Sequence, residues 1–536
     1  MRPFDASGAF RPAAAEGELR GLAVRGAGAT LFSGGVGLAV QVVATITLAR
    51  LLTPSDFGVV AMVTTFSLLL VNFGANGFTE AILQFEEVNH VLASNLFWIN
   101  FGVGILLTAS FAGAGSLLAQ FYRDPRVAHV AVGTSLSILI GSTSVLHQAL
   151  LKRSMYFSSL SVNDIISRSV SVAVSILLAW AGWRYWALVA GVVAAPLSTS
   201  IGVWILCRWT PGFPRRAAKT GPMVRFAMHV YGRFTVNYFS RNTDNLLVGW
   251  RFDAQALGFY KKAYDLFALS AALLVSPLAN VAVAALSRFD PRSAQFRRYF
   301  LNALTVMAFV GMGLGADLTL VGKDVIRLLL GPGWGESGRI FMFFGPGIGI
   351  MMLYYTHGWI HLSIGRADRW FRWGIAEFAC TFLMFLVGLR WGPAGVAVAW
   401  TASFWILTIP SLWYAGRPVQ FGVAPMLGTV WRFVLASATA GCAVAYLIGK
   451  IPGVLAGPSR MEAVARIGSI SIIFLILYVA MVIVLHGGFG PLYQIAKLVQ
   501  EMAPFRRFSK LAPAPAMACA TATTEELPVP QGQGPR

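Results

Sequence analysis

Polar residues recur at four-residue steps inside an otherwise apolar stretch, residues 226–250. The four are Arg233, Asn237, Arg241 and Asn245. Side chains four apart share one face of a helix, so this spacing predicts a slowly drifting polar stripe. Guanidinium groups bind phosphate oxygens in pairs and keep their charge when desolvated, so Arg233 and Arg241 are predicted to hold an anion. Asp244 lies beside the stripe, and an Arg241–Asp244 clamp between helices is the alternative.

Carboxylates within the apolar stretches form a second candidate set, because acidic groups inside a membrane often mark ion pathways. They are Asp164, Asp244, Asp317 and Glu377. For Asp317 and Glu377 the alternative is a structural position within about a turn of an interface, with no part in coupling. Asp164 stands four residues before Arg168, so the two side chains can neutralise each other on one helix. Alternatively, Arg168 is free to bind the substrate anion.

Aromatic and histidine side chains gather in the stretch 339–364 and are candidates for contact with a sugar. They are Tyr354, His357, Trp359 and His361. The two histidines have the spacing of zinc ligands, but the string HGWIH lacks the glutamate of the HExxH motif and no third ligand is near. No nucleophile stands beside a base. The sequence therefore predicts no metal site, no cofactor, no catalytic residue and no enzyme.

The segments that carry these residues are built for a membrane. Of 536 residues, 56% are hydrophobic and only 12% are charged, with a mean hydropathy of +0.66. About 14 apolar stretches of roughly 20 residues fill most of the chain between 27 and 489, which leaves no room for a soluble catalytic domain. Long continuous runs predict helices rather than barrel strands. The predicted spans are 29–50, 57–83, 94–119, 127–150, 159–182, 185–207, 226–250, 258–285, 299–321, 339–364, 370–390, 392–415, 427–449 and 466–486.

The charges indicate how the chain is oriented. The net charge of +20 is spread over the loops instead of one soluble surface, so no nucleic-acid partner is predicted. With the N-terminus inside, about 24 Lys and Arg fall on cytoplasmic segments and about 14 on outer ones, which places both termini in the cytoplasm. The predicted non-spanning parts are an N-terminal segment (1–26), a basic loop (208–225), a short interfacial helix and turn (323–337), and a tail (490–536) that is disordered from about 503.

An internal repeat is visible at an offset of about 200 residues. Residues 48–61 (LARLLTPSDFGVVA) parallel residues 248–261 (VGWRFDAQALGFYK), and Gly58 coincides with Gly258. We therefore expect an all-α integral membrane protein of two pseudo-symmetric six-helix lobes, followed by two C-terminal helices. The lobes are 27–207 and 226–415, and the two further spans lie within 416–489. Repeat-built bundles are a common transporter design, with the site between the repeats.

Several strings, in the same order, resemble one transporter family. They are ARLLTPSDFGVVAM (49–62), GFTEAILQFEEVN (77–89), NLFWINFGVGILL (95–107), FYRDPRV (121–127), ALLKRSMYF (149–157), NTDNLLVGWRFDAQALGFYKKAYDL (242–266) and LLLGPGWGES (328–337). Together they resemble Wzx-type flippases of the colanic-acid and succinoglycan exporter kind. These form the polysaccharide-exporter branch of the multidrug/oligosaccharidyl-lipid/polysaccharide (MOP) flippase superfamily.

The resemblance implies a multi-pass transporter in a bacterial inner membrane. It would move a polyprenyl-pyrophosphate-linked oligosaccharide from the cytoplasmic to the periplasmic leaflet by alternating access of the two lobes. Expected partners are the lipid-linked oligosaccharide, membrane lipids and a polysaccharide polymerase or export machinery. A peptidoglycan-precursor flippase and a cation-coupled small-molecule exporter remain alternatives. A membrane-embedded polymerase or ligase usually has a large outer loop, whereas no outer loop here exceeds about 20 residues.

Overall fold

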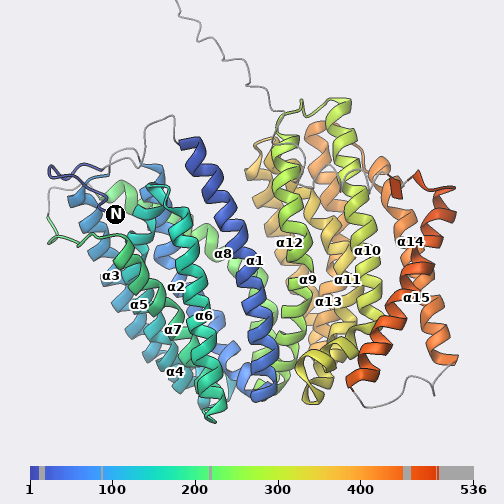
Figure 1. Ribbon diagram of the computed structural model, residues 1–536, viewed down its shortest axis with the longest axis horizontal. Helices are drawn as coiled ribbons and strands as arrows, with labels where there is room; N and C mark the ends of the chain where they lie inside the picture. The colour runs from blue at the N-terminus through green and yellow to red at the C-terminus, as the bar shows by residue number, and fades with distance from the viewer. Residues whose placement is uncertain (11–18, 86–87, 216–219, 451–459, 491, 494–536) are drawn as a thin grey trace, which may run out of the picture. The chain divides into compact units, whose positions relative to one another are not determined.

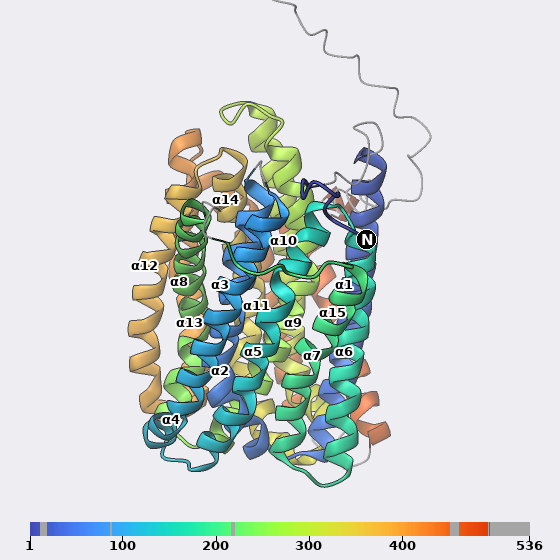
Figure 2. The same cartoon turned by 90° about the vertical axis from the view of Figure 1, so that its left-hand side faces the viewer.

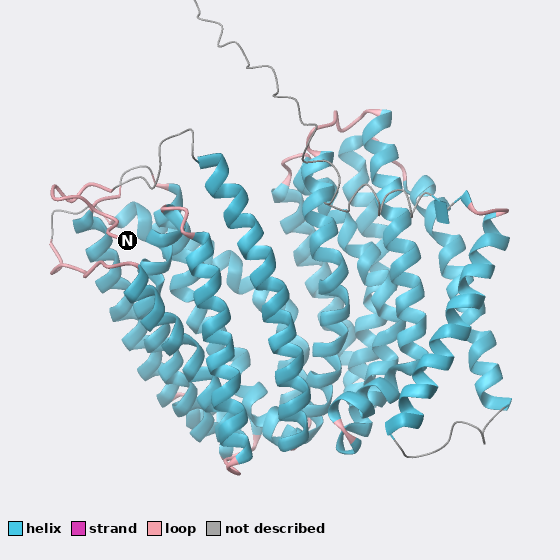
Figure 3. Cartoon of the chain, viewed as in Figure 1, coloured by secondary structure: helices cyan, strands magenta, loops and turns pink. Residues whose placement is uncertain are grey.

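The computed structural model describes residues 1–10, 19–85, 88–215, 220–450, 460–490 and 492–493. Within these ranges the regular structure is helical, apart from isolated bridges between Phe4 and Phe10 and between Ala9 and Asn89 (Figures 1 and 3). The α-helices are α1 (Leu19–Leu51), α2 (Pro54–Gln84), α3 (His90–Gly113), α4 (Gly115–Tyr122), α5 (Arg126–Arg153), α6 (Phe157–Trp180), α7 (Tyr185–Leu206), α8 (Gly221–Arg251), α9 (Ala254–Leu286), α10 (Ala294–Leu330), α11 (Gly335–Ser363), α12 (Ala367–Gly388), α13 (Gly392–Gly416), α14 (Val423–Lys450) and α15 (Arg460–His486).

Eleven helical stretches in the described part of the chain are long and apolar enough to cross a membrane. One of them, Asp368–Val419, has 52 residues and contains both α12 and α13. At about 1.5 Å per residue its helices add up to more than twice the roughly 30 Å thickness of a hydrocarbon core. The all-helical, multi-pass membrane fold is therefore confirmed. The number of fourteen crossings stays a prediction, although each predicted span overlaps a helix.

Local sequence fixes where the paired helices α2 and α9 begin. Thr53 accepts a hydrogen bond from the backbone N–H of Asp56, the Asp56 carboxylate accepts one from the backbone N–H of Thr53 at 2.9 Å, and Pro54 occupies the first turn. Asp253 caps α9 by accepting from the backbone N–H of Ala256 at 2.7 Å. Capping side chains satisfy amides that a helix start leaves unpaired. Both turns are therefore sharp, well-defined corners that follow a preceding helix directly.

Helices α1 to α7 pack largely against one another. Helix α5 contacts α2, α3 and α7, and α6 lies against α1 and α7 (Figure 2). Small residues allow these close approaches: Gly104 of α3 faces Ser142 of α5, and Asn100 donates a hydrogen bond to the Ser142 carbonyl at 2.7 Å. Small and hydrogen-bonding residues are typical of helix contacts in membranes, where apolar surface alone favours no partner.

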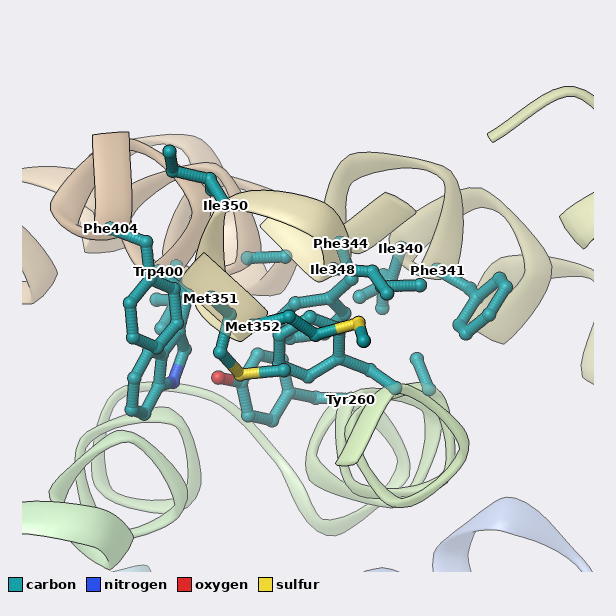
Figure 4. Close-up of a cluster of buried hydrophobic side chains, with 14 of the residues drawn as sticks. Tyr260, Ile340, Phe341, Phe344, Ile348, Ile350, Met351, Met352, Trp400 and Phe404 are labelled. Carbon is teal, nitrogen blue, oxygen red and sulfur yellow. The ribbon is translucent and has the colours of Figure 1, made fainter. Parts of the chain in front are cut away.

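Helix α11 is the centre of the following group. It contacts α9, α10 and α13, and residues 347–354 are all buried. Figure 4 shows this cluster, in which Tyr260 of α9 and Trp400 of α13 lie beside the buried side chains of α11. Helix α14 packs on α10, and the Tyr478 hydroxyl of α15 donates to the Phe309 carbonyl at 2.8 Å. The last two helices are thus attached to α10.

The chain's two halves meet where α1 turns into α2 and α8 turns into α9. A Cβ on Gly58 would overlap the Ala254 carbonyl oxygen, and a Cβ on Gly258 would overlap the Pro54 carbonyl oxygen. Glycine is needed at both positions because backbone lies against backbone there. Helix α8 also follows α2, since the Tyr231 hydroxyl donates to the Leu69 carbonyl at 2.9 Å.

Two side chains strengthen this meeting point between the halves. Arg50, in the last turn of α1, donates to the Leu328 carbonyl at 2.8 Å and to that of Leu329 at 3.3 Å. In return, the Trp334 indole Nε1 donates to the Ala49 carbonyl at 2.8 Å. Each bond satisfies a carbonyl that the end of a helix leaves open. The C-terminal ends of α1 and α10 are thus joined by reciprocal hydrogen bonds.

The structure corrects one predicted element. The short interfacial helix expected over 323–337 is wrong, because α10 continues without a break to Leu330 and only a single 3-10 turn, Pro332–Trp334, follows. Residues 323–330 contain neither glycine nor proline, whereas Gly331 has φ 104° and Pro332 comes next. These two residues end the helix. Of the predicted tail, residues 491 and 494–536 lie outside the described residues.

Candidate functional site

A cavity of about 410 Å³ lies among α8, α9, α11, α12 and α13. Its walls combine aromatic rings with one guanidinium and one carboxylate, which is the mixture typical of ligand pockets. The lining residues are Val230, Phe234, Val236, Arg241, Tyr264, Tyr354, Tyr355, His357, Trp370, Phe371, Gly374, Ile375, Glu377, Phe378, Thr381 and Trp400.

Arg241 is the cation of the cavity. Its side chain is exposed, and its guanidinium carbon lies 6.0 Å from the centre of the Tyr355 ring. Among the described residues it has no hydrogen bond and no ion pair. Glu377 of α12 also lines the cavity and forms no ion pair with Arg241. A guanidinium held by a ring face alone keeps all five N–H donors for a ligand.

Asp244 does not form the alternative clamp with Arg241. Its carboxylate is fully buried, and one oxygen accepts hydrogen bonds from the Tyr260 hydroxyl at 2.8 Å and from the Trp400 Nε1 at 2.9 Å. The other oxygen has no partner among the described residues. Asp244 therefore links α8 to α9 and α13 through Tyr260 and Trp400, two of the residues labelled in Figure 4.

The predicted stripe winds around α8 toward the C-terminal end of the helix. Arg241 reaches the cavity, whereas Asn245 is buried and its side-chain oxygen has no described partner. A four-residue step overshoots a helical turn by about 40°, so successive members of the stripe face different neighbours. Arg233 and Asn237 belong to the same continuous helix, but their side chains lie outside the described part of the structure. The predicted anion site thus rests on Arg241.

All four side chains predicted on α11 are buried, but only two of them line the cavity. Tyr354 and His357 line the cavity, and the Tyr354 hydroxyl accepts a hydrogen bond from the Trp373 Nε1 at 2.8 Å. Trp359 and His361 are buried at 3% and 0% exposure and are not part of the lining. Tyr354 and His357 are therefore the ones placed to touch a sugar.

The other predicted residues lie away from this cavity. Arg168 and Asp164 form the predicted ion pair on α6, with Nε to Oδ2 at 2.9 Å and both side chains about half exposed. Arg168 lies over Gly37 of α1. Asp317 of α10 accepts a hydrogen bond from Ser471 of α15 at 3.1 Å. Within the residues that the structure describes, no group of three or more metal-ligating side chains comes together.

Sequence reasoning missed two ring-bearing residues that shape the site, Tyr264 and Trp400. Tyr264 lies one turn beyond Tyr260 on α9, and its ring is 5.9 Å from that of Trp400. Trp400 could have been found, because it stands in the middle of a predicted span and not in the belts near the interfaces where membrane tryptophans concentrate. Tyr264 carries no such signal. Its role follows only from the packing of α9 beside α11 and α13.

This cavity belongs to a chain whose residues 47–339 match the family described as polysaccharide biosynthesis protein. The chain belongs to this family. The polysaccharide biosynthesis proteins similar to it include the teichuronic acid biosynthesis protein TuaB of Bacillus subtilis (strain 168), 25% identical over 336 residues that cover 60% of this chain and 69% of TuaB. The succinoglycan biosynthesis transport protein ExoT of Rhizobium meliloti (strain 1021) is 22% identical over 66% of this chain and 72% of its own.

Among solved structures, the fold of this polysaccharide biosynthesis protein is similar to that of the lipid II flippase MurJ in an inward closed conformation. The TM-score is 0.67 at 14% identity, over 85% of this chain and 98% of MurJ. An identity this low shows the fold alone. The family match and the relatives confirm the predicted resemblance to polysaccharide biosynthesis proteins, and MurJ and a MATE family transporter of the MOP superfamily (TM-score 0.58 at 10% identity) have the fold that the resemblance implies. The prediction of a transporter and not an enzyme agrees with the description of ExoT as a transport protein.

Proposed function

We propose that this polysaccharide biosynthesis protein flips a polyprenyl-pyrophosphate-linked oligosaccharide repeat unit from the cytoplasmic to the periplasmic leaflet of a bacterial inner membrane. The observation that carries the proposal is Arg241, which projects into an aromatic-lined cavity without a hydrogen-bond or ion-pair partner among the described residues. A guanidinium without a carboxylate partner is costly inside a membrane, so it indicates a ligand that supplies the negative charge.

The cavity suits the two chemical parts of such a substrate. The guanidinium of Arg241 matches the diphosphate, because paired N–H groups fit phosphate oxygens and remain charged when water is excluded. Tyr354, His357 and Trp400 supply ring faces and polar edges for the sugar next to it. Phe234 and Val236 add an apolar wall from α8. The polyprenyl chain would remain in the surrounding lipid.

Alternating access would use the two predicted lobes, 27–207 and 226–415, as the moving bodies, with fourteen membrane crossings in all. The reciprocal glycine crossing of α2 and α9 supports this symmetry, because Gly58 and Gly258 are the repeat-equivalent residues and make equivalent contacts. With both termini in the cytoplasm, that crossing closes the periplasmic side. Opening it, while the cytoplasmic side closes, would present the bound sugar to the periplasm.

Ion coupling is assigned to Glu377 among the four candidate carboxylates, since it is the one that lines the cavity. Asp244 is held by two donors, Asp164 is paired with Arg168, and Asp317 joins α10 to α15. A carboxylate facing Arg241 can change the free charge of the site when it gains or loses a cation or a proton. A polysaccharide polymerase or export complex is the expected partner that removes the flipped unit.

The test is to delete the chromosomal gene and to determine in which leaflet the lipid-linked oligosaccharides then accumulate. The deletion is complemented with the wild type, with Arg241→Gln and with the control Arg339→Gln, whose side chain is 67% exposed at the start of α11. The proposal predicts a completed repeat unit on the cytoplasmic face in the deletion strain and in Arg241→Gln. The wild type and the control restore export.

Other outcomes would reject the proposal. An unpolymerised unit on the periplasmic face would mean that flipping is intact and would favour a polymerase or partner role. No accumulation of any lipid-linked oligosaccharide would favour a small-molecule exporter instead. Accumulation of a peptidoglycan precursor would identify the alternative flippase.

A further inference from the structure

Helix α11 carries a pair of buried histidines, His357 and His361. His357 is 2% exposed and lines the cavity, and His361 is 0% exposed and lies one turn further along. Their ring centres are 6.0 Å apart at an interplanar angle of 81°. Three of their four ring nitrogens, Nε2 of His357 and both nitrogens of His361, have no hydrogen-bond partner among the described residues. Buried polar atoms are nearly always paired, so this arrangement indicates a function.

The fourth nitrogen, Nδ1 of His357, determines which tautomer the neutral His357 ring adopts. Its Nδ1 lies 2.5 Å from the backbone carbonyl oxygen of Tyr354. A carbonyl oxygen can only accept, so Nδ1 carries the hydrogen. In the neutral ring Nε2 then holds a lone pair and is the free proton acceptor. A neutral His357 is therefore ready to take one proton, and the protonated ring would be a second cation in the wall that contains Arg241.

His361 connects that acceptor to the exposed end of α11 and α12. Its ring centre is 5.7 Å from that of Tyr414, and the Arg369 guanidinium lies 4.1 Å from the same Tyr414 ring. Beyond this layer, Arg366 and Asp368 form an ion pair with both side chains about half exposed. His361 thus lies between His357 and the charged groups near the end of α11 and the start of α12.

Other ionisable groups face the pair from most of the elements packed around it, and they set its electrostatic surroundings. Glu377 and Arg241 share the cavity wall with His357, and the charged groups that act on His361 are Arg366, Asp368 and Arg369. Together with the ring hydroxyls, the groups around the pair are Arg241 of α8, Tyr264 of α9, Tyr354 and Tyr355 of α11, Arg366 before α12, Asp368, Arg369 and Glu377 of α12, and Tyr414 of α13.

We propose that His357 and His361 form a proton-binding site whose occupancy is linked to the binding of a diphosphate anion in the cavity. A proton on His357 adds positive charge beside the anion, and an anion at Arg241 favours that proton by the same free energy, because linkage is reciprocal. The proton comes from bulk solution, and no covalent bond other than N–H is made. This inference rests on the proposed function, since it requires an anion in the cavity.

Titration calorimetry of inorganic pyrophosphate into the purified full chain tests the linkage. Repeating the titration in two buffers of different ionisation enthalpy gives the number of protons taken up on binding. The variants are His357→Gln, Glu377→Gln and the control His129→Gln, whose side chain is exposed on α5. Pyrophosphate's own ionisation is the same in every titration, so differences between variants report the protein. Glu377→Gln separates the carboxylate from the histidines.

The wild type and His129→Gln are expected to take up as much as one proton more than His357→Gln. Their Kd should also weaken more steeply with rising pH, by up to about tenfold per pH unit, the limit for one linked proton. Equal proton uptake by the wild type and His357→Gln, with binding that Arg241→Gln abolishes, overturns this inference and leaves the proposed function standing. No binding by the wild type at any pH overturns both.

A second measurement does not depend on a variant that folds. Nitrogen-15 spectra of the histidine-labelled wild type at neutral pH are recorded with and without pyrophosphate. The inference predicts that imidazole signals move from the neutral to the protonated pattern when pyrophosphate binds. Histidine signals that do not change at saturating pyrophosphate contradict it.

Discussion

Gly58 of α2 and Gly258 of α9 take equivalent places in one helix crossing. Each lies against a backbone carbonyl oxygen in the first turn of the other helix, Ala254 for Gly58 and Pro54 for Gly258. No side chain fits between the two backbones. The two helix starts can therefore approach only if both residues lack a Cβ, and this approach is one of the contacts that hold the periplasmic side closed in our proposal.

Alanine at either glycine is expected to destabilise the protein. In an ordinary helix the change from Gly to Ala stabilises by about 1 kcal/mol. Here the added carbon meets backbone that cannot rotate away, so Gly58→Ala and Gly258→Ala should each cost about 1–3 kcal/mol. Thermal unfolding of the purified protein measures this, with Gly34→Ala as the control because nothing lies within 4 Å of that position. An unfolding midpoint at or above the wild-type value for Gly58→Ala would contradict the crossing.

Trp334→Phe tests the hydrogen bond that joins α1 to the end of α10. Phenylalanine keeps an aromatic ring near Phe57, whose ring centre is 5.4 Å from that of Trp334, but it removes the donor to the Ala49 carbonyl. We expect the free energy of unfolding to fall by about 1–3 kcal/mol, because the variant leaves a buried carbonyl unpaired and has a smaller ring. The same unfolding measurement applies. Trp391→Phe, at a residue 68% exposed, should change little.

Two substitutions of Asp244 separate its packing role from ion coupling. Asp244→Asn keeps an oxygen that can accept from Tyr260 and Trp400, whereas Asp244→Leu leaves both buried donors unpaired at about 1–3 kcal/mol each. We expect Asp244→Asn to be the more stable variant and to export polysaccharide at close to the wild-type rate. Export that Asp244→Asn abolishes, at wild-type stability, would instead show that the charge of Asp244 is used for coupling.

The Arg168–Asp164 pair can be tested by removing one charge or both. Arg168→Gln leaves Asp164 unpaired on a membrane helix, so less protein should be found inserted in the membrane. Arg168→Gln combined with Asp164→Asn removes both charges and should restore the inserted amount and export together. Normal insertion without export by the double variant would mean that Arg168 binds substrate, and quantitative membrane fractionation with an export assay distinguishes the two results.

The sequence alone predicted the helices, because a long continuous apolar run can satisfy its backbone hydrogen bonds in a bilayer only as a helix. It also placed Arg241 and Asp244 on one helix, since their spacing depends only on the helical repeat. It could not decide which of them reaches the cavity, because that depends on how α8 is rotated against α2, α9 and α13. For the same reason the sequence did not predict Tyr264, whose position in the cavity wall follows from packing between segments far apart in the sequence.

Two further differences have local causes. The continuation of α10 to Leu330 was missed because a positively charged turn of helix near an interface resembles an amphipathic surface helix in composition. The sequence also could not predict which side chains of α11 line the cavity. The four candidates are Tyr354, His357, Trp359 and His361. Their spacing brings all four near each other on α11, but only the positions of α12 and α13 determine which side chains border the cavity.

The most direct test is transport by the purified chain alone. The protein is reconstituted into vesicles that contain a fluorescent polyprenyl-pyrophosphate-linked oligosaccharide, and its appearance in the outer leaflet is followed by a membrane-impermeant quencher. The wild type and Arg339→Gln should move the lipid much faster than it moves in protein-free vesicles. The transport rate of Arg241→Gln should fall close to that background. Transport by Arg241→Gln at the wild-type rate, or a wild type no faster than empty vesicles, would contradict the claim that an unpaired Arg241 carries the diphosphate across.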